Sequence, residues 1–328
     1  MIFGSLLFND GYETLGVIYI VSIEKDAGKT AVCAGLARIV QNSGKTAGYL
    51  KPHILPGDEA DRDMAFMKEL LGKTEAGPEH AGGREVVFVE AMLGHKPEDL
   101  ASRTTYGAAR EMQASVIAVE AWTGNESPFI DVYKGFGDAL TGLILNKVPK
   151  SRFAAAAETV KAQCEAAGIA LLGVIPEDRT LLSVTVQELA EKFSGDIINN
   201  REKAGEFVEN FMVGALIVDS GLTYFGRKTQ KAAILRQDRP DMQFAALETP
   251  TACLLLGGSR EKPLYNVLQK AEQRKIPVIV TDMPVRDIAD GIDDMLLATP
   301  FRHEQKVDRL AKLLRESIDT KLVVQERR

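Results

Sequence analysis

The sequence predicts an α/β protein in which a parallel sheet with helices on both faces is followed by a smaller α/β domain. Short apolar runs alternate with amphipathic stretches through the first half of the chain, beginning with VIYIV at residues 17–21. Continuous apolar runs of this length are typical of parallel strands that are buried on both faces. The alternation resumes after an interruption near Pro176, so a second α/β layer is expected there.

In the first half, the apolar runs predict strands and the stretches between them predict helices. The expected strands cover residues 17–21, 47–50, 86–89, 115–119, 143–145 and 170–175. The expected helices cover residues 31–40, 61–71 and 151–167, and Ser151 is the expected N-cap of the last one.

The second half opens with a capping box. Thr185 and Glu188 have the spacing at which each side chain accepts a hydrogen bond from the other residue's backbone N–H, and Val184 and Leu189 are placed as the hydrophobic staple. Further strands are expected at 213–218, 231–235, 252–256 and 278–280, and helices at 241–247, 264–274, 285–295 and 303–318. We therefore divide the chain into a leader (1–16), a first domain (17–180), a second domain (181–300) and a C-terminal helix and tail (301–328).

Composition excludes several classes of protein. The 328 residues are 45% hydrophobic and 26% charged, with a net charge of −6, which argues against long disorder, a nucleic-acid coat protein or a membrane-surface binder. Three widely separated cysteines predict a reducing compartment, hence the cytoplasm, and no structural zinc. No apolar stretch is long enough for a spanning helix, and the start of the chain lacks the basic flank of a signal peptide.

The most informative motif is Gly28-Lys29-Thr30, which lies between the first expected strand and the following helix. A glycine lets backbone N–H groups approach phosphate oxygens, and a helix N-terminus adds partial positive charge. Lys29 can reach the β- and γ-phosphates, and the Thr30 hydroxyl can bind Mg²⁺. A second Gly-Lys-Thr at 44–46 precedes a strand, so we discount it. The alternative for the first copy is an incidental turn. The expected nucleotide-binding residues of this loop are Asp26, Ala27, Gly28, Lys29, Thr30 and Ala31.

Acidic residues near the ends of neighbouring strands supply candidate metal ligands. Glu90 ends the apolar run 86–89, where a strand beside the first one would deliver its carboxylate to the metal side of a phosphate site. Asp61 and Asp63 follow the second expected strand, and they also fit a charge complement at a helix N-terminus. The motif and these acids together predict a P-loop NTPase-type sheet. The four histidines are too dispersed for a metal set, and Trp122 fits a packing role or the mouth of the site.

The first half resembles the dethiobiotin-synthetase-like branch of P-loop ATPases. The matching segments are residues 22–30, Tyr49-Leu-Lys51-Pro52, Val89-Glu90, residues 145–148 (LNKV) and residues 173–176 (GVIP). The resemblance implies ATP and Mg²⁺ at the carboxyl edge of the sheet, with Lys29 and Thr30 on phosphate and metal and Asp63, or else Asp61, and Glu90 beside the metal. It also implies that Lys51 points at the γ-phosphate or a substrate carboxylate and that Asn146 lies near the base. The chain departs from the family at Ser22, which replaces glycine, and at Ala91-Met92, which replaces a glycine-containing segment.

The second half resembles the DRTGG domain. The matching segments are residues 213–215 (VGA), 233–239 (AILRQDR), 244–249 (FAALET) and 253–258 (CLLLGG), and Asp178-Arg179-Thr180 lies just before them. An ATPase-like domain followed by a DRTGG domain resembles the front part of long phosphotransacetylases. Because no acyltransferase domain follows in this sequence, phosphotransacetylase activity itself is not expected. The resemblance implies regulation and self-association, hence a homodimer through residues 181–300. The Gly257-Gly258 pair fits an anion-binding turn or a tight strand-to-helix connection.

Three hypotheses follow from these observations. The first is an ATP- and Mg²⁺-binding sensor or regulatory protein of acyl or central carbon metabolism, favoured by an intact Gly-Lys-Thr with altered surroundings. The second is a ligase-like enzyme in which Lys51 positions a carboxylate and Lys29 neutralises charge on the transferred phosphoryl group. The third is an assembly protein whose P-loop binds nothing.

Overall fold

The computed structural model describes residues 16–51, 59–72, 85–124, 130–214, 221–297 and 301–320. They form two compact units. The first unit contains the chain up to Asp178 and again from Phe301 onward, and the second is Arg179–Pro300. The expected leader lies almost entirely outside the described residues.

The first unit is built on a six-stranded sheet in the order β2-β3-β1-β4-β5-β6, and every pair is parallel. The strands are β1 (Gly16–Ser22), β2 (Ala47–Leu50), β3 (Val86–Met92), β4 (Ser115–Ala121), β5 (Leu140–Val148) and β6 (Leu171–Pro176). In β1 every residue after Gly16 is buried, as its unbroken apolar run predicts. The α/β class with a P-loop-type core is thereby confirmed.

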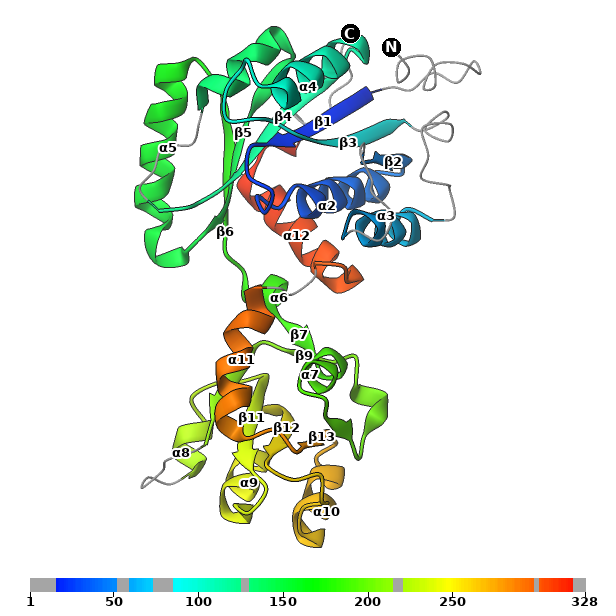
Figure 1. Ribbon diagram of the computed structural model, residues 1–328, viewed down its shortest axis with the longest axis vertical. Coiled ribbons are helices and arrows are strands. Elements are labelled where there is room, and N and C mark those ends of the chain that lie inside the picture. The colour runs from blue at the N-terminus through cyan, green and yellow to red at the C-terminus, as the bar shows by residue number, and fades with distance from the viewer. Residues whose placement is uncertain are drawn as a thin grey trace. The chain divides into compact units, whose positions relative to one another are not determined.

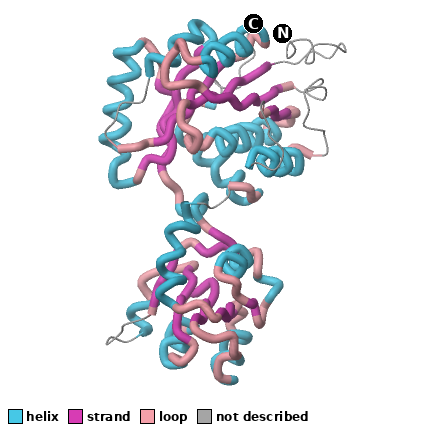
Figure 2. Tube along the Cα trace, viewed as in Figure 1, coloured by secondary structure: helices cyan, strands magenta, loops and turns pink. Residues whose placement is uncertain are grey.

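Helices cover both faces of this sheet (Figure 1). They are α2 (Lys29–Asn42), α3 (Glu59–Leu70), α4 (Leu100–Glu111), α5 (Phe153–Ala167) and α12 (Glu304–Ser317). One apolar core joins alternate residues of β1, including Val17 and Tyr19, to α4 and α5. Helices α2, α3 and α12 lie on the other face, and Figure 2 shows the strands as the middle layer of this unit.

The C-terminal helix α12 packs against the helix that follows the Gly-Lys-Thr loop. Gly35 of α2 lies so close to Leu314 and Leu310 that a Cβ atom there would come within 2.6 Å of the Leu314 side chain. Arg38 of α2 also forms ion pairs with Glu304 and Asp308 of α12. Residues that follow the second unit therefore help to fix the position of α2.

The second unit contains a five-stranded sheet in the order β10-β11-β12-β13-β8, in which only β8 is antiparallel to its neighbour. The strands of this sheet are β8 (Asp196–Ile197), β10 (Asn210–Val213), β11 (Lys231–Arg236), β12 (Thr251–Gly257) and β13 (Val278–Thr281). Two further strands of the unit, β7 (Val184–Thr185) and β9 (Phe207–Val208), form a separate antiparallel pair. The α-helices of the unit are α6 (Arg179–Leu182), α7 (Val186–Lys192), α8 (Gly221–Phe225), α9 (Pro240–Leu247), α10 (Tyr265–Gln273) and α11 (Val285–Leu297). The Thr185–Glu188 capping box is present at the start of α7.

Several details differ from the sequence-based expectations, and three of them have a clear physical reason. Ser151 does not cap α5, because it lies inside the 3₁₀ turn Lys150–Arg152 and the helix begins at Phe153 without a side-chain cap. The strand expected at 213–218 runs instead over Asn210–Val213, and residues 215–218 lie outside the described part of the chain. Helix α4 was not expected, since its buried residues are Ser102, Thr105 and Ala109 rather than large apolar ones.

Within the described residues, no helix combines the length and apolar composition of a membrane span.

Candidate nucleotide-binding site

Gly28 ends the loop between β1 and α2 and fixes its shape. Its φ of 90° lies in the left-handed region, and a Cβ atom there would lie 2.5 Å from Nδ2 of Asn146. Asn146, near the end of β5, donates a hydrogen bond to the carbonyl of Ala27 at 3.0 Å. Glycine is therefore required both by backbone conformation and by close packing.

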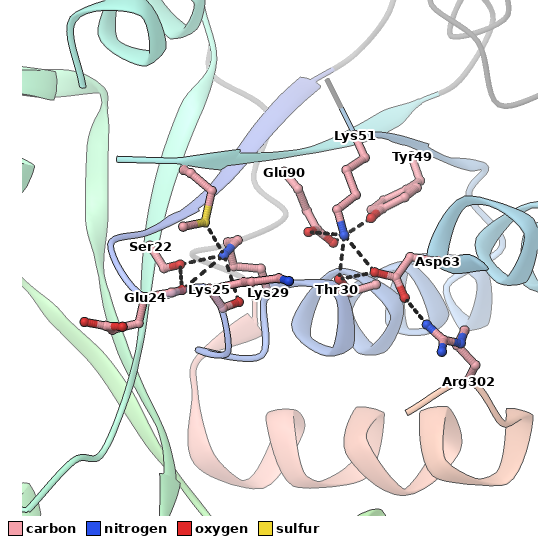
Figure 3. A network of polar contacts seen from close by, with 11 residues as sticks. Ser22, Glu24, Lys25, Lys29, Thr30, Tyr49, Lys51, Asp63, Glu90 and Arg302 are labelled. Atoms are coloured by element: carbon pink, nitrogen blue, oxygen red, sulfur yellow. Dashed lines mark hydrogen bonds and ion pairs between the residues drawn. The ribbon is translucent and has the colours of Figure 1, made fainter. Parts of the chain in front are cut away.

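Lys29 begins α2 and turns its side chain back over the loop (Figure 3). Its Nζ donates to Ser22 Oγ at 2.6 Å and to the Glu24 carbonyl at 3.3 Å, and it lies 3.0 Å from Met92 Sδ. Burial lowers the pKa of Lys29, and the nearby carboxylate of Glu90 opposes that shift. The two departures from the family, Ser22 and Met92, thus both contact the loop lysine.

A second group of side chains surrounds the Lys51 ammonium at the carboxyl ends of β2 and β3 (Figure 3). Lys51 Nζ lies 2.7 Å from Asp63 Oδ2 and 3.5 Å from both Glu90 Oε2 and Thr30 Oγ1. Thr30 Oγ1 also donates to Asp63 Oδ2 at 3.3 Å. Four residues from separate parts of the sequence thus meet beside the loop. We call the three that surround the Lys51 ammonium, Thr30, Asp63 and Glu90, the acidic cluster.

Buried partners hold the carboxylate of Glu90 in place. Tyr49 donates its hydroxyl proton to Glu90 Oε1 at 2.6 Å, and both side chains are buried. Burial, followed by the charge of Glu90, raises the pKa of Tyr49 well above its usual value, so the phenol stays a hydrogen-bond donor. Burial also opposes the charge on Lys51, but Glu90 and Asp63 outweigh that effect and raise its pKa. Lys51 is therefore a stable cation in this site.

Arg302 binds the acidic cluster from the segment that follows the second unit. Its guanidinium lies 2.8 Å from Asp63 Oδ1, and its neighbour Phe301 packs edge-on against Phe66 of α3. Both oxygens of Asp63 therefore have cationic partners. Nothing local in the sequence marks Arg302, because it lies 239 positions from Asp63 in the chain.

Glu120 is a second residue that the sequence analysis missed. It lies near the end of β4, where it accepts hydrogen bonds from the Ile23 backbone N–H at 3.1 Å and from the Tyr133 hydroxyl. Burial raises the pKa of Glu120, and the two donors oppose that shift. Glu120 follows the apolar run 116–119 just as Glu90 follows the run 86–89, so the same sequence pattern could have identified it.

The remaining expected site residues have simpler positions. Asp26 is exposed, and its carbonyl accepts a hydrogen bond from Lys147 Nζ at 2.7 Å, while Ala31 lies in the first turn of α2. Asp61 belongs to α3, but its side chain lies outside the described part of the structure. Trp122 packs against the apolar core. The described residues contain no group of three or more His, Cys, Asp or Glu side chains that could hold a metal by themselves.

The acidic cluster and the loop have the chemistry of a nucleotide site. One hydroxyl and two carboxylates converge on one point, and oxygen ligands of this kind suit Mg²⁺, which usually takes only one or two carboxylates and completes its shell with water and phosphate. The loop at the N-terminus of α2 adds backbone N–H groups and the helix dipole. The residues present therefore fit Mg²⁺ together with a polyphosphate, provided that the phosphates supply part of the metal's coordination.

The glycine turn of the second unit is used by the fold itself. Gly258 has a φ of 95°, and its backbone N–H donates to the Met283 carbonyl at 3.0 Å. A Cβ atom at Gly257 would lie 2.7 Å from that same carbonyl oxygen. These contacts hold the glycine pair against the loop that follows β13, so the Gly258 amide already donates a hydrogen bond within the chain.

Comparison with known proteins agrees with both halves of the architecture. Residues 16–121 match the family profile of an AAA domain, and residues 188–295 match that of the DRTGG domain. A phosphate acetyltransferase of Pseudomonas aeruginosa is 22% identical over an alignment that covers 89% of this chain and 49% of the relative. The chain thus spans about half the length of that relative.

Among solved structures, the chain is similar to the CBS and DRTGG domains of the regulatory region of Clostridium perfringens pyrophosphatase, in complex with the activator diadenosine tetraphosphate. The identity is 15%, the alignment covers 50% of this chain and 75% of that one, and the TM-score is 0.30. The two profile matches and the curated relative confirm the resemblance seen in the sequence. Residues 16–121 and 188–295 thus match an AAA domain and a DRTGG domain, in the order that the sequence resemblance predicts.

Proposed function

We propose that this chain binds ATP with Mg²⁺ at the Gly28-Lys29-Thr30 loop and acts as a regulatory or sensing protein. The proposal is supported by one observation: Thr30, Asp63 and Glu90 converge on the ammonium of Lys51 beside that loop. A hydroxyl and two carboxylates at the start of a P-loop helix provide the metal side of a nucleotide site.

Each part of the loop has a role in this proposal. Backbone N–H groups at the start of α2 would donate to phosphate oxygens, and Lys29 would exchange Ser22 Oγ for a β- or γ-phosphate oxygen. Thr30, Asp63 and Glu90 would hold the metal, with Asp61 as the alternative to Asp63. Bound Mg²⁺ would neutralise charge on the phosphates. Asn146 would fix the loop through Ala27 near the nucleotide base.

The regulatory role rests on the domain that follows. A DRTGG domain is attached to the P-loop unit, and the curated relative that shares both halves is a phosphate acetyltransferase. We therefore place the chain in acyl or central carbon metabolism, in the cytoplasm, as a homodimer formed through residues 181–300. Light scattering of the full-length chain tests the dimer: twice the chain mass supports it, and a monomer at micromolar concentration contradicts it.

Equilibrium dialysis of ATP against the full-length chain, with and without Mg²⁺, tests nucleotide binding. We expect binding that strengthens when Mg²⁺ is present, because the cation joins the phosphates to the two carboxylates. An absence of binding at millimolar ATP would reject the proposal and would favour a purely structural role for the P-loop unit.

A ligase-like activity is the second candidate, and the position of Lys51 favours it. Its ammonium lies beside the loop, where it could pair with a substrate carboxylate while Lys29 neutralises the transferred phosphoryl group. ADP release that depends on an added carboxylate, and that is lost in both Lys29→Ala and Lys51→Ala, would support this activity. ATP binding without any carboxylate-dependent release would leave the sensor as the better account.

A further inference from the structure

The ammonium of Lys51 lies at the place where a divalent cation would bind. Its Nζ is within 3.5 Å of Asp63 Oδ2, Glu90 Oε2 and Thr30 Oγ1, the three oxygens that the proposed function assigns to Mg²⁺. Figure 3 shows the side chain of Lys51 reaching into this group from the end of β2. A lysine ammonium and a metal ion cannot share this position.

The charges around this position are already balanced. Asp63 and Glu90 bring two negative charges, while Lys51 and Arg302 bring two positive charges within 3.5 Å of those carboxylates. All four side chains are largely buried, with at most 23% of any of them exposed. Lys29 adds a further positive charge that interacts with Glu90. A divalent cation would therefore enter a group with no net negative charge and no phosphate to compensate it, and Mg²⁺ gives up its water shell reluctantly.

We infer that Lys51 is an internal counter-ion that keeps divalent cations out until a nucleotide arrives. This inference rests on the proposed function and specifies how the site is regulated. A nucleoside triphosphate carries enough negative charge to accept both the metal and the displaced ammonium. Lys51 has a flexible four-carbon stem, so its ammonium can leave the acidic cluster and pair with phosphate oxygens as the metal takes its place. Metal binding is therefore coupled to nucleotide binding.

Binding of Mn²⁺ to the nucleotide-free, full-length chain tests this inference, with electron paramagnetic resonance measuring the free ion. In the wild type we expect weak binding. Lys51→Met removes the ammonium and keeps an unbranched side chain, so we expect Mn²⁺ affinity to rise by at least about tenfold, given the strength of charge interactions at this separation. Lys68→Met changes the net charge equally at an exposed position of α3 and should leave Mn²⁺ affinity unchanged.

Two further variants locate the new site and guard against misfolding. Adding Glu90→Gln to Lys51→Met should abolish the gain in Mn²⁺ affinity, because it removes one of the two carboxylates. Lys51→Gln, which keeps a hydrogen-bond donor without the charge, should show the same gain of at least about tenfold, and it replaces Lys51→Met as the test variant if the latter unfolds. The inference is overturned if the wild type binds Mn²⁺ as tightly as the folded Lys51 variants do.

These outcomes are separate from those that test the proposed function. Failure of the wild type to bind ATP would reject the nucleotide site, yet a gain in Mn²⁺ affinity in Lys51→Met would still show that the ammonium excludes the metal. Conversely, normal binding of ATP with Mg²⁺ together with unchanged Mn²⁺ affinity in the nucleotide-free Lys51 variants would reject the counter-ion role alone.

Discussion

Arg302 forms an ion pair with Asp63 at 2.8 Å, which links the segment that follows the second unit to the acidic cluster beside the Gly28-Lys29-Thr30 loop. The second unit, Arg179–Pro300, is inserted between β6 and this segment, so Arg302 follows it by two residues. The first unit is therefore completed only when the chain returns from the inserted domain. A second ion pair at the departure point, Arg309 with the buried Asp178 at 2.6 Å, has the same effect.

Removing Arg302 should destabilise the first unit. In Arg302→Met, Asp63 loses the partner of Oδ1 while remaining mostly buried, so we expect a loss of about 1 kcal/mol in the free energy of unfolding. Urea denaturation of the full-length chain measures it, and Arg103→Met, at an exposed position of α4, is the matched control. Equal stability of the two variants would show that the ion pair contributes nothing.

The buried Glu120 should make stability fall as the pH rises. Burial raises its pKa in the folded state above the unfolded value, so the folded protein holds this proton more tightly and loses stability as the pH passes through the folded pKa. Glu120→Gln keeps an acceptor for Ile23 and Tyr133 but cannot ionise. We expect its stability relative to wild type to increase from pH 4 toward pH 8, measured by urea denaturation. A constant difference over that range would contradict this account.

Lys231 should produce the opposite pH dependence in the second unit. Its side chain is fully buried at the start of β11, where Nζ donates to Thr249 Oγ1 and the Pro250 carbonyl, and burial lowers its pKa to about 8. Since the unfolded chain keeps this proton to higher pH, stability should rise between pH 8 and 10 by up to about 1.4 kcal/mol per unit relative to Lys231→Met. Parallel pH profiles for the two proteins would rule this out.

The capping box of α7 should contribute measurably to stability. Thr185 Oγ1 accepts from the Glu188 N–H at 3.1 Å, and Glu188 Oε2 accepts from the Thr185 N–H at 2.7 Å. Thr185→Ala should therefore cost about 1 kcal/mol in the free energy of unfolding, whereas Thr185→Ser should cost much less. Chemical denaturation of the three proteins measures both effects, and an alanine variant as stable as wild type would contradict them.

The sequence predicts the fold best where burial is continuous. The VIYIV run forms β1, and all five of its residues are buried between the helices on the two faces of the sheet. The sequence does not predict helix α4, because small and polar residues form its buried face and its apolar periodicity is therefore weak. The two-residue strands β7 and β9 are too short to leave any periodic pattern.

Residues of the candidate site could be predicted where a nearby strand or motif in the sequence indicates their position. Lys51 directly follows β2, Glu90 lies near the end of β3, and Thr30 and Asp63 lie near the start of the helices that follow β1 and β2. Parallel topology therefore predicts that all four lie toward one edge of the sheet. Arg302 reaches the same site from the far end of the chain, and only the tertiary fold can show that.

Isothermal titration calorimetry of ATP, in the presence of Mg²⁺, tests the nucleotide site most directly. The two Gly-Lys-Thr sequences provide matched variants of the full-length chain, Lys29→Met in the loop before α2 and Lys45→Met before β2. We expect Lys29→Met to weaken ATP binding at least about tenfold, because it removes one charge-assisted hydrogen bond, and Lys45→Met to bind ATP like the wild type. Equal affinities in all three proteins, or no heat of binding at millimolar ATP, would contradict it.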